Sequence, residues 1–200
     1  MKFNLFGIGF DVSYLSVALL CLAVLISSDG SMIIYMCIVS SILHETGHIV
    51  ALSCFSCKPK HISITPSDIS ISCDMSLLST GKEVLVNLSG PAINLTLSLF
   101  FGIVLPGSKV FCQFALCNLV IGLFNLLPVT GLDGGNTLHL ILMNTLTYKT
   151  TQITMNIVST IIIIPVLTAG FMILFSSRYN YSLLFVGIYM TLLLITKEMR

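Results

Sequence analysis

The stretch "SSILHETGHIVALS", residues 40–53, places three ionisable side chains, His44, Glu45 and His48, in an otherwise apolar run. The surrounding segment, residues 31–54, is long enough to cross a bilayer as a helix, which takes about 20 apolar residues. A charged side chain near the centre of such a helix costs about 2.5–3.5 kcal/mol on insertion scales. Ionisable groups grouped at that depth therefore indicate a functional site.

The composition indicates a membrane protein. Of the 200 residues, 56% are hydrophobic and only 8% are charged, whereas soluble domains are about 25% charged. The mean hydropathy is +1.02. The formal net charge of +1 provides no basic surface of the kind that binds nucleic acid.

Six apolar segments predict an all-α polytopic fold with about six transmembrane helices. They are residues 10–28, 31–54, 84–105, 110–128, 153–176 and 181–196. The first has no small-residue cleavage site, so we expect it to be retained and not removed as a signal peptide. Between the second and third lies "HISITPSDISIS", residues 61–72, in which isoleucines alternate with polar residues around a Pro-Ser-Asp turn. That pattern predicts a small β-hairpin or sheet.

With six spans, the lysines and arginines are distributed unevenly between the two sides of the membrane. One side receives Lys2, Lys58, Lys60, Lys82, Lys149, Lys197 and Arg200, and the other receives Lys109 and Arg178. Basic residues favour the cytoplasmic side, so we expect both termini and the hairpin in the cytoplasm. At about 1.5 Å per residue, His44 would then lie about 15 Å inside the cytoplasmic end of its helix.

The spacing of His44 and His48 predicts a metal site. Histidines at i and i+4 project from one face of a helix, so both imidazoles can reach one ion. Glu45 is then placed to act as a general base on an attacking water, as His-Glu-x-x-His segments do in zinc hydrolases. The alternative is a helix whose polar face only bonds neighbouring helices, which would bury these groups without function.

Catalytic zinc takes three protein ligands, so a third ligand should also lie near apolar segments. Among the eight acidic residues, Asp133 in "FNLLPVTGLDGGNTL" fits best, since all the others except Glu45 lie in loops or near the termini. Pro128 interrupts the preceding helix, and Gly131 and the following glycines allow the backbone to approach a neighbour closely. The alternative is that Asp133 simply caps the next helix.

Three ordered blocks resemble the site-2 protease family of intramembrane zinc metalloproteases. They are "HETGH" (44–48), "SGPAINL" (89–95) and "NLLPVTGLDGG" (125–135). The resemblance as a whole covers about residues 31–140. The amino-acid sequence of the third block and the six-span layout look most like the sporulation-type branch. This branch includes a peptidase that processes a sigma-factor precursor. The family is bound to the lipid bilayer and acts on protein substrates with a membrane segment.

The resemblance implies His44, His48 and Asp133 as ligands of one Zn²⁺ ion and Glu45 as the catalytic base. It also implies that Asn94 and Asn125 lie near the substrate. We therefore expect one metalloprotease domain over residues 1–200, without PDZ or CBS domains, in a bacterial cell membrane. Regulation of the kind that such domains provide is then either absent or supplied by a membrane partner.

Two other functions are alternatives to proteolysis. A metal or small-solute transporter would need ionisable groups spread over several depths or inverted repeats, and neither is present in the sequence. A catalytically silent membrane scaffold would not need Glu45. Cys54 and Cys57 form a single CxxC, which allows a redox or second metal site, although zinc modules usually carry two such pairs.

Overall fold

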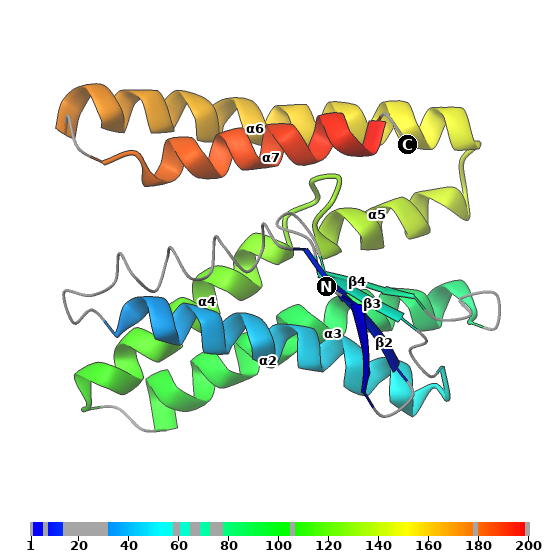
Figure 1. Cartoon of the computed structure of the whole chain (residues 1–200). Helices are drawn as coiled ribbons and strands as arrows, with labels where there is room; N and C mark the ends of the chain where they lie inside the picture. Colours follow the sequence, from blue (N-terminus) through cyan, green and yellow to red (C-terminus); the bar gives the residue numbers. More distant parts are fainter. Residues whose placement is uncertain are drawn as a thin grey trace. The chain divides into compact units, whose positions relative to one another are not determined.

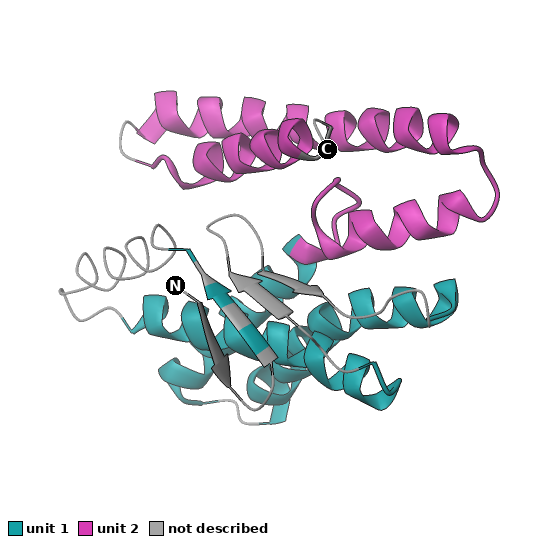
Figure 2. Ribbon diagram, turned by 45° about the vertical axis from the view of Figure 1, so that its right-hand side comes forward, with its two compact units in different colours: residues 1–124 teal, residues 125–200 magenta. Residues whose placement is uncertain are grey.

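The computed structural model describes residues 2–5, 8–13, 32–57, 61–64, 69–72, 78–104, 107–177 and 180–198. Two units have dense internal contacts, unit 1 comprising Met1–Phe124 and unit 2 comprising Asn125–Arg200 (Figure 2). The expected catalytic core, residues 31–140, draws on both units. Each unit is described by itself below.

Unit 1 contains a four-stranded sheet. The strands are β1 (Lys2–Leu5), β2 (Ile8–Val12), β3 (His61–Ile64) and β4 (Ile69–Ser72), in the order β1-β2-β3-β4 (Figure 1). The β1–β2 and β3–β4 pairs are antiparallel, whereas β2 and β3 run parallel.

The strands both confirm and correct the sequence prediction. Strands β3 and β4 pair as the expected hairpin, with Ile62 opposite Ile71. The two N-terminal strands were not predicted, and the expected first span was wrong in its first residues, because 10–12 belong to β2. Residues 14–28 of that span lie outside the described part of the chain. The cytoplasmic position of the hairpin stays a prediction.

The described residues of unit 1 also form three helices. They are α2 (Ile33–Cys54), α3 (Thr80–Leu99), which continues as the π-helical segment η3 (Phe100–Val104), and α4 (Lys109–Asn125). Helices α2 and α3 approach closely, since a Cβ added at Gly47 would lie 2.8 Å from the carbonyl oxygen of Ser89. Helix α4 ends three residues before its expected end at 128, because Pro128 disfavours helical geometry in the residue before it.

Unit 2 contains the remaining helices, α5 (Asp133–Met143), α6 (Tyr148–Ser177) and α7 (Ser182–Glu198). Helices α6 and α7 lie side by side (Figure 1), and small residues let them pack closely. A Cβ added at Gly170 would lie 2.9 Å from the Cα of Leu184, and one added at Gly187 would lie 2.7 Å from Leu167 Cδ2. The expected last two spans, 153–176 and 181–196, correspond to α6 and α7.

Among the described residues, three helical segments are long and apolar enough to cross a bilayer: Met32–Cys54, Thr80–Val104 and Tyr148–Ser177. Helices α4 and α7 are apolar but shorter. With 17 residues, each extends about 26 Å, somewhat less than the hydrocarbon thickness of about 30 Å. The chain is membrane-embedded, and the count of six spans stays a prediction.

A small apolar cluster in unit 1 explains the CxxC segment. Cys57 is buried with Leu52, Leu78 and Val86, whereas Cys54 is exposed. A buried thiol among aliphatic side chains behaves as a small hydrophobic residue. The two cysteines therefore differ in surroundings, and the packing role of Cys57 accounts for its burial without a second metal site.

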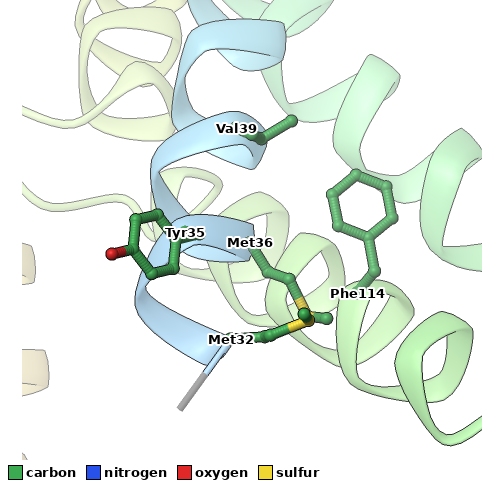
Figure 3. Close-up of a pocket in the computed structure, with 5 residues that line it drawn as sticks. All are labelled: Met32, Tyr35, Met36, Val39 and Phe114. Carbon is green, nitrogen blue, oxygen red and sulfur yellow. The ribbon is translucent and has the colours of Figure 1, made fainter. Parts of the chain in front are cut away.

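An apolar pocket lies between α2 and α4 in unit 1 (Figure 3). It has a volume of about 250 Å³ and is lined by Met32, Tyr35, Met36, Val39 and Phe114. Its five lining residues include no histidine, cysteine or acidic side chain. The pocket is thus separate from the chemistry of the two histidines further along α2.

Candidate metal centre

The imidazole rings of His44 and His48 meet on one face of α2. Their Nε2 atoms are 3.2 Å apart, and the ring centroids are 4.9 Å apart with an interplanar angle of 77°. His44 is 5% exposed, and His48 is partly buried. The i, i+4 spacing therefore directs both rings to one point, as the sequence predicted.

The Nδ1 atom of His44 lies 2.6 Å from Oδ1 of Asn94 in α3. The orientation of this amide is fixed by its other end, since Asn94 Nδ2 donates to the carbonyl oxygen of Ser40 and to Oδ1 of Asn118. With its nitrogen committed to two acceptors, Asn94 presents an oxygen to His44. His44 must then carry its proton on Nδ1 and donate it to Asn94.

The ring of His48 is held in the same way by a backbone group. Its Nδ1 atom lies 2.8 Å from the carbonyl oxygen of Val86 in α3. The Ser89 hydroxyl also donates to that carbonyl. A carbonyl oxygen can only accept, so His48 also carries its proton on Nδ1.

These contacts test whether the pair fits a metal ion. A neutral imidazole has one donor nitrogen and one acceptor nitrogen, and both Nδ1 atoms are the donors here. The two Nε2 atoms are then both acceptors, and two acceptors 3.2 Å apart cannot hydrogen-bond to each other. Histidine ligands of metals usually donate their other ring N–H to an oxygen, as both rings do here. The donor set fits a divalent cation such as zinc.

Gly90 leaves space for the two rings. A Cβ added at this residue would overlap His48 Nε2 and would lie 2.8 Å from His44 Nε2. Gly90 is buried in α3, in the segment "SGPAINL". A residue without a side chain is therefore required for α3 to pass beside the imidazoles.

Two other predicted site residues belong to unit 1. Glu45 directly follows His44 in α2 and is partly buried. We expected Asn94 to lie near the substrate, but it is fully buried and its amide bonds His44, Ser40 and Asn118. Asn94 thus holds a histidine ring through its amide oxygen, and its position near the substrate stays a prediction.

Asp133 stands in unit 2, at the first residue of α5, after a tightly folded loop. Gly131 has φ +104°, a conformation that favours glycine. A Cβ added at Gly134 would overlap the backbone of Leu126, and one added at Gly135 would overlap that of Val129. The glycines therefore let the loop fold against the first turn of α5, as the sequence predicted. The N-cap residue is Leu132, so Asp133 does not take the capping position.

The loop before Asp133 is also held from α6. The backbone N–H of Thr130 donates to the hydroxyl of Ser159, which is fully buried, and the two hydroxyl oxygens are 3.1 Å apart. Asn125 is the last residue of α4 and is partly buried. Its predicted contact with substrate stays a prediction.

Sequence reasoning missed Asn118 and Val86. Asn118 is fully buried in α4 and bonds Asn94. An asparagine in an apolar span was the available signal, because a buried amide needs hydrogen-bond partners. Val86 contributes only its backbone oxygen, which no side-chain pattern could have shown.

A solved structure of similar fold extends over nearly the whole chain. The site-2 protease from Methanocaldococcus jannaschii matches with a TM-score of 0.69 and 21% identity, covering 95% of this chain and 91% of that one. This chain has the site-2 protease fold.

Two sequence comparisons agree with that fold. Residues 106–169 match the family described as Peptidase family M50, a range that contains Asn125 and Asp133. The zinc metalloprotease MJ0392 of the same organism is 31% identical over 137 residues, which are 64% of this chain. The chain spans about 40% of the length of that relative.

Proposed function

We propose that this chain is an intramembrane zinc metalloprotease in which His44, His48 and Asp133 hold one zinc ion and Glu45 is the general base. The observation that carries the proposal is the pair of histidines whose Nδ1 atoms both donate to oxygens, so that both Nε2 atoms accept. The site-2 protease fold and the M50 match support it. A transporter or a silent scaffold would not need a general base beside two such ligands.

Each residue of the proposed site has a separate role in hydrolysis. Zinc, when bound, polarises the scissile carbonyl and makes water more acidic. Glu45 takes a proton from the water as its oxygen attacks the carbonyl carbon, and returns that proton to the amine when the C–N bond breaks. Asn125 would hold the substrate backbone beside the reacting carbonyl. Asn94 and Val86 keep the histidine rings in one orientation.

The proposed substrate is a protein with a membrane-spanning or membrane-associated segment. Because "NLLPVTGLDGG" resembles the sporulation-type branch, we propose a sigma-factor precursor as one such substrate. We also propose that the chain lies in a bacterial cell membrane with both of its termini in the cytoplasm. A membrane partner would regulate access. Detection of the cleaved precursor in cells that express the wild-type chain and not Glu45→Gln would test this assignment.

Zinc content tests the three-ligand site. Wild-type protein purified in detergent should hold about one zinc per chain, and Asp133→Ala should lose most of it, because catalytic zinc needs three protein ligands. Glu83→Ala is the matched control, since Glu83 also lies in the first turn of a helix. Atomic absorption measures both. Zinc-free wild-type protein with an intact fold would contradict the proposal.

Strand β4 lies at the edge of the described sheet, and we propose that the substrate adds beside it as an extended strand. Successive N–H groups of a strand point to opposite edges of that strand. Ser70→Pro and Ile71→Pro therefore remove N–H donors from opposite edges of β4, and one of the two variants loses a donor at the outer edge. That variant should cleave fluorescein-labelled casein about tenfold more slowly with zinc unchanged. Wild-type rates in both variants would contradict strand addition.

A further inference from the structure

A chain of hydrogen bonds, all donated in one direction, joins two asparagines and one histidine on three helices of unit 1. Asn118 Nδ2 in α4 donates to the carbonyl oxygen of Phe114 at 2.9 Å. Asn94 Nδ2 in α3 donates to Asn118 Oδ1, also at 2.9 Å. His44 in α2 lies 2.6 Å from Asn94 Oδ1. We call this series the amide relay.

The direction of the amide relay is set at its far end. The Phe114 carbonyl can only accept, so Asn118 must point its nitrogen there and its oxygen toward Asn94. If Asn94 were reversed, its oxygen would face the oxygens of Asn118 and Ser40 at 2.9 and 3.1 Å. Both asparagines are fully buried, so water does not offer an alternative partner.

We propose that Asn118 is a positioning residue of the metal centre. Through Asn94 it keeps the His44 proton on Nδ1, so that Nε2 is the deprotonated nitrogen that can bind the ion. This inference rests on the proposed function for its metal. Asn118 itself contacts neither the metal ligands' Nε2 atoms nor the reacting groups, and lies outside the sequence blocks that resemble the family.

Near-isosteric substitutions separate the hydrogen bonds from packing. Asn118→Leu keeps the number and branching of the side-chain heavy atoms but leaves one buried N–H of Asn94 without its acceptor. Asn118→Asp, in its neutral form, accepts from Asn94 and donates to Phe114, so it reproduces both bonds. Cys117→Ala is the control for altered packing, because Cys117 is the neighbouring residue in α4 and contacts Cys37 of α2, with the sulfur atoms 3.4 Å apart.

Zinc affinity, measured by competition with a chelator, gives the first readout. We expect Asn118→Leu to bind zinc about tenfold more weakly, in the range found for residues that orient metal ligands. Asn118→Asp and Cys117→Ala should stay within about threefold of wild type. Equal affinity in wild type and Asn118→Leu would overturn the proposal. So would equal losses in Asn118→Leu and Asn118→Asp, because the loss would then come from packing.

The position of the His44 proton gives a second readout that needs no zinc. Long-range ¹H–¹⁵N spectra of metal-free, ¹⁵N-histidine protein should show His44 protonated on Nδ1, with the resonance assigned by its absence in His44→Ala. Asn118→Leu should move part of the population to Nε2. An unchanged spectrum would overturn the relay. Zinc-free wild-type protein would instead refute the proposed function, while this spectrum still tests the relay.

Discussion

Replacement of Glu45 by glutamine should abolish peptide hydrolysis and leave zinc bound. Glutamine keeps the size of the side chain but cannot accept a proton, and a positioned general base contributes about 10²–10⁴-fold to a rate. Fluorescein-labelled casein in detergent is a suitable substrate, because an unfolded chain presents peptide bonds without prior unwinding. Cleavage is read from the release of fluorescent peptides, and zinc from atomic absorption.

The control for Glu45→Gln is Glu83→Gln, which removes a carboxylate from α3 and should cleave at the wild-type rate. Loss of both cleavage and zinc in Glu45→Gln would show that Glu45 maintains the site and is not only a base. Undiminished cleavage would show that Glu45 is not the general base and that another group activates the attacking water. Retained zinc without cleavage also makes this variant useful for trapping the unknown substrate.

Replacement of Gly90 by alanine should remove the metal centre. The added methyl group would overlap the rings of His44 and His48, so one imidazole must turn away or α3 must move from α2. We expect zinc affinity to fall by at least about 100-fold, the upper range for changes that misorient ligands. Chelator competition measures the change, and casein cleavage should disappear with it.

Gly81→Ala provides the matched control for Gly90→Ala. Gly81 lies in the same helix, and a Cβ there would meet no heavy atom within 4 Å among the described residues. This substitution should leave zinc binding unchanged and slightly stabilise the helix, by up to about 1 kcal/mol. Circular dichroism should show native helix content in both variants. Normal zinc affinity in a folded Gly90→Ala protein would contradict the geometry of α2 and α3.

The features that sequence analysis predicted best depend on local spacing. The convergence of His44 and His48 follows from helical periodicity, and the 61–72 hairpin follows from alternation around turn residues. The close turn before Asp133 follows from glycines that leave room for the backbone. In each case the deciding residues are neighbours along the chain, so no knowledge of distant packing was required.

The features that the sequence did not predict depend on contacts between distant segments. Asn94 was expected to contact substrate, because nothing in the segment "SGPAINL" shows that α2 and α4 enclose its amide. The bond between Asn94 and His44 joins residues 50 positions apart. Strand β2 was missed because residues 10–12 merged with the following apolar run, and only its pairing with β1 and β3 distinguishes it.

The parallel pairing of β2 with β3 imposes an order on assembly during synthesis. The β1–β2 hairpin can form as soon as residues 2–12 have emerged, whereas β3 is made only after the whole of α2. Strand β4 follows last, and the β4 edge is where we propose that substrates add. A growing chain therefore contains both histidines before it contains that edge, and before Asn94 and Asn118 exist to fix them. A chain that ends before β4 and α3 would thus lack both the contacts that orient the two histidines and the edge at which we propose that substrates add.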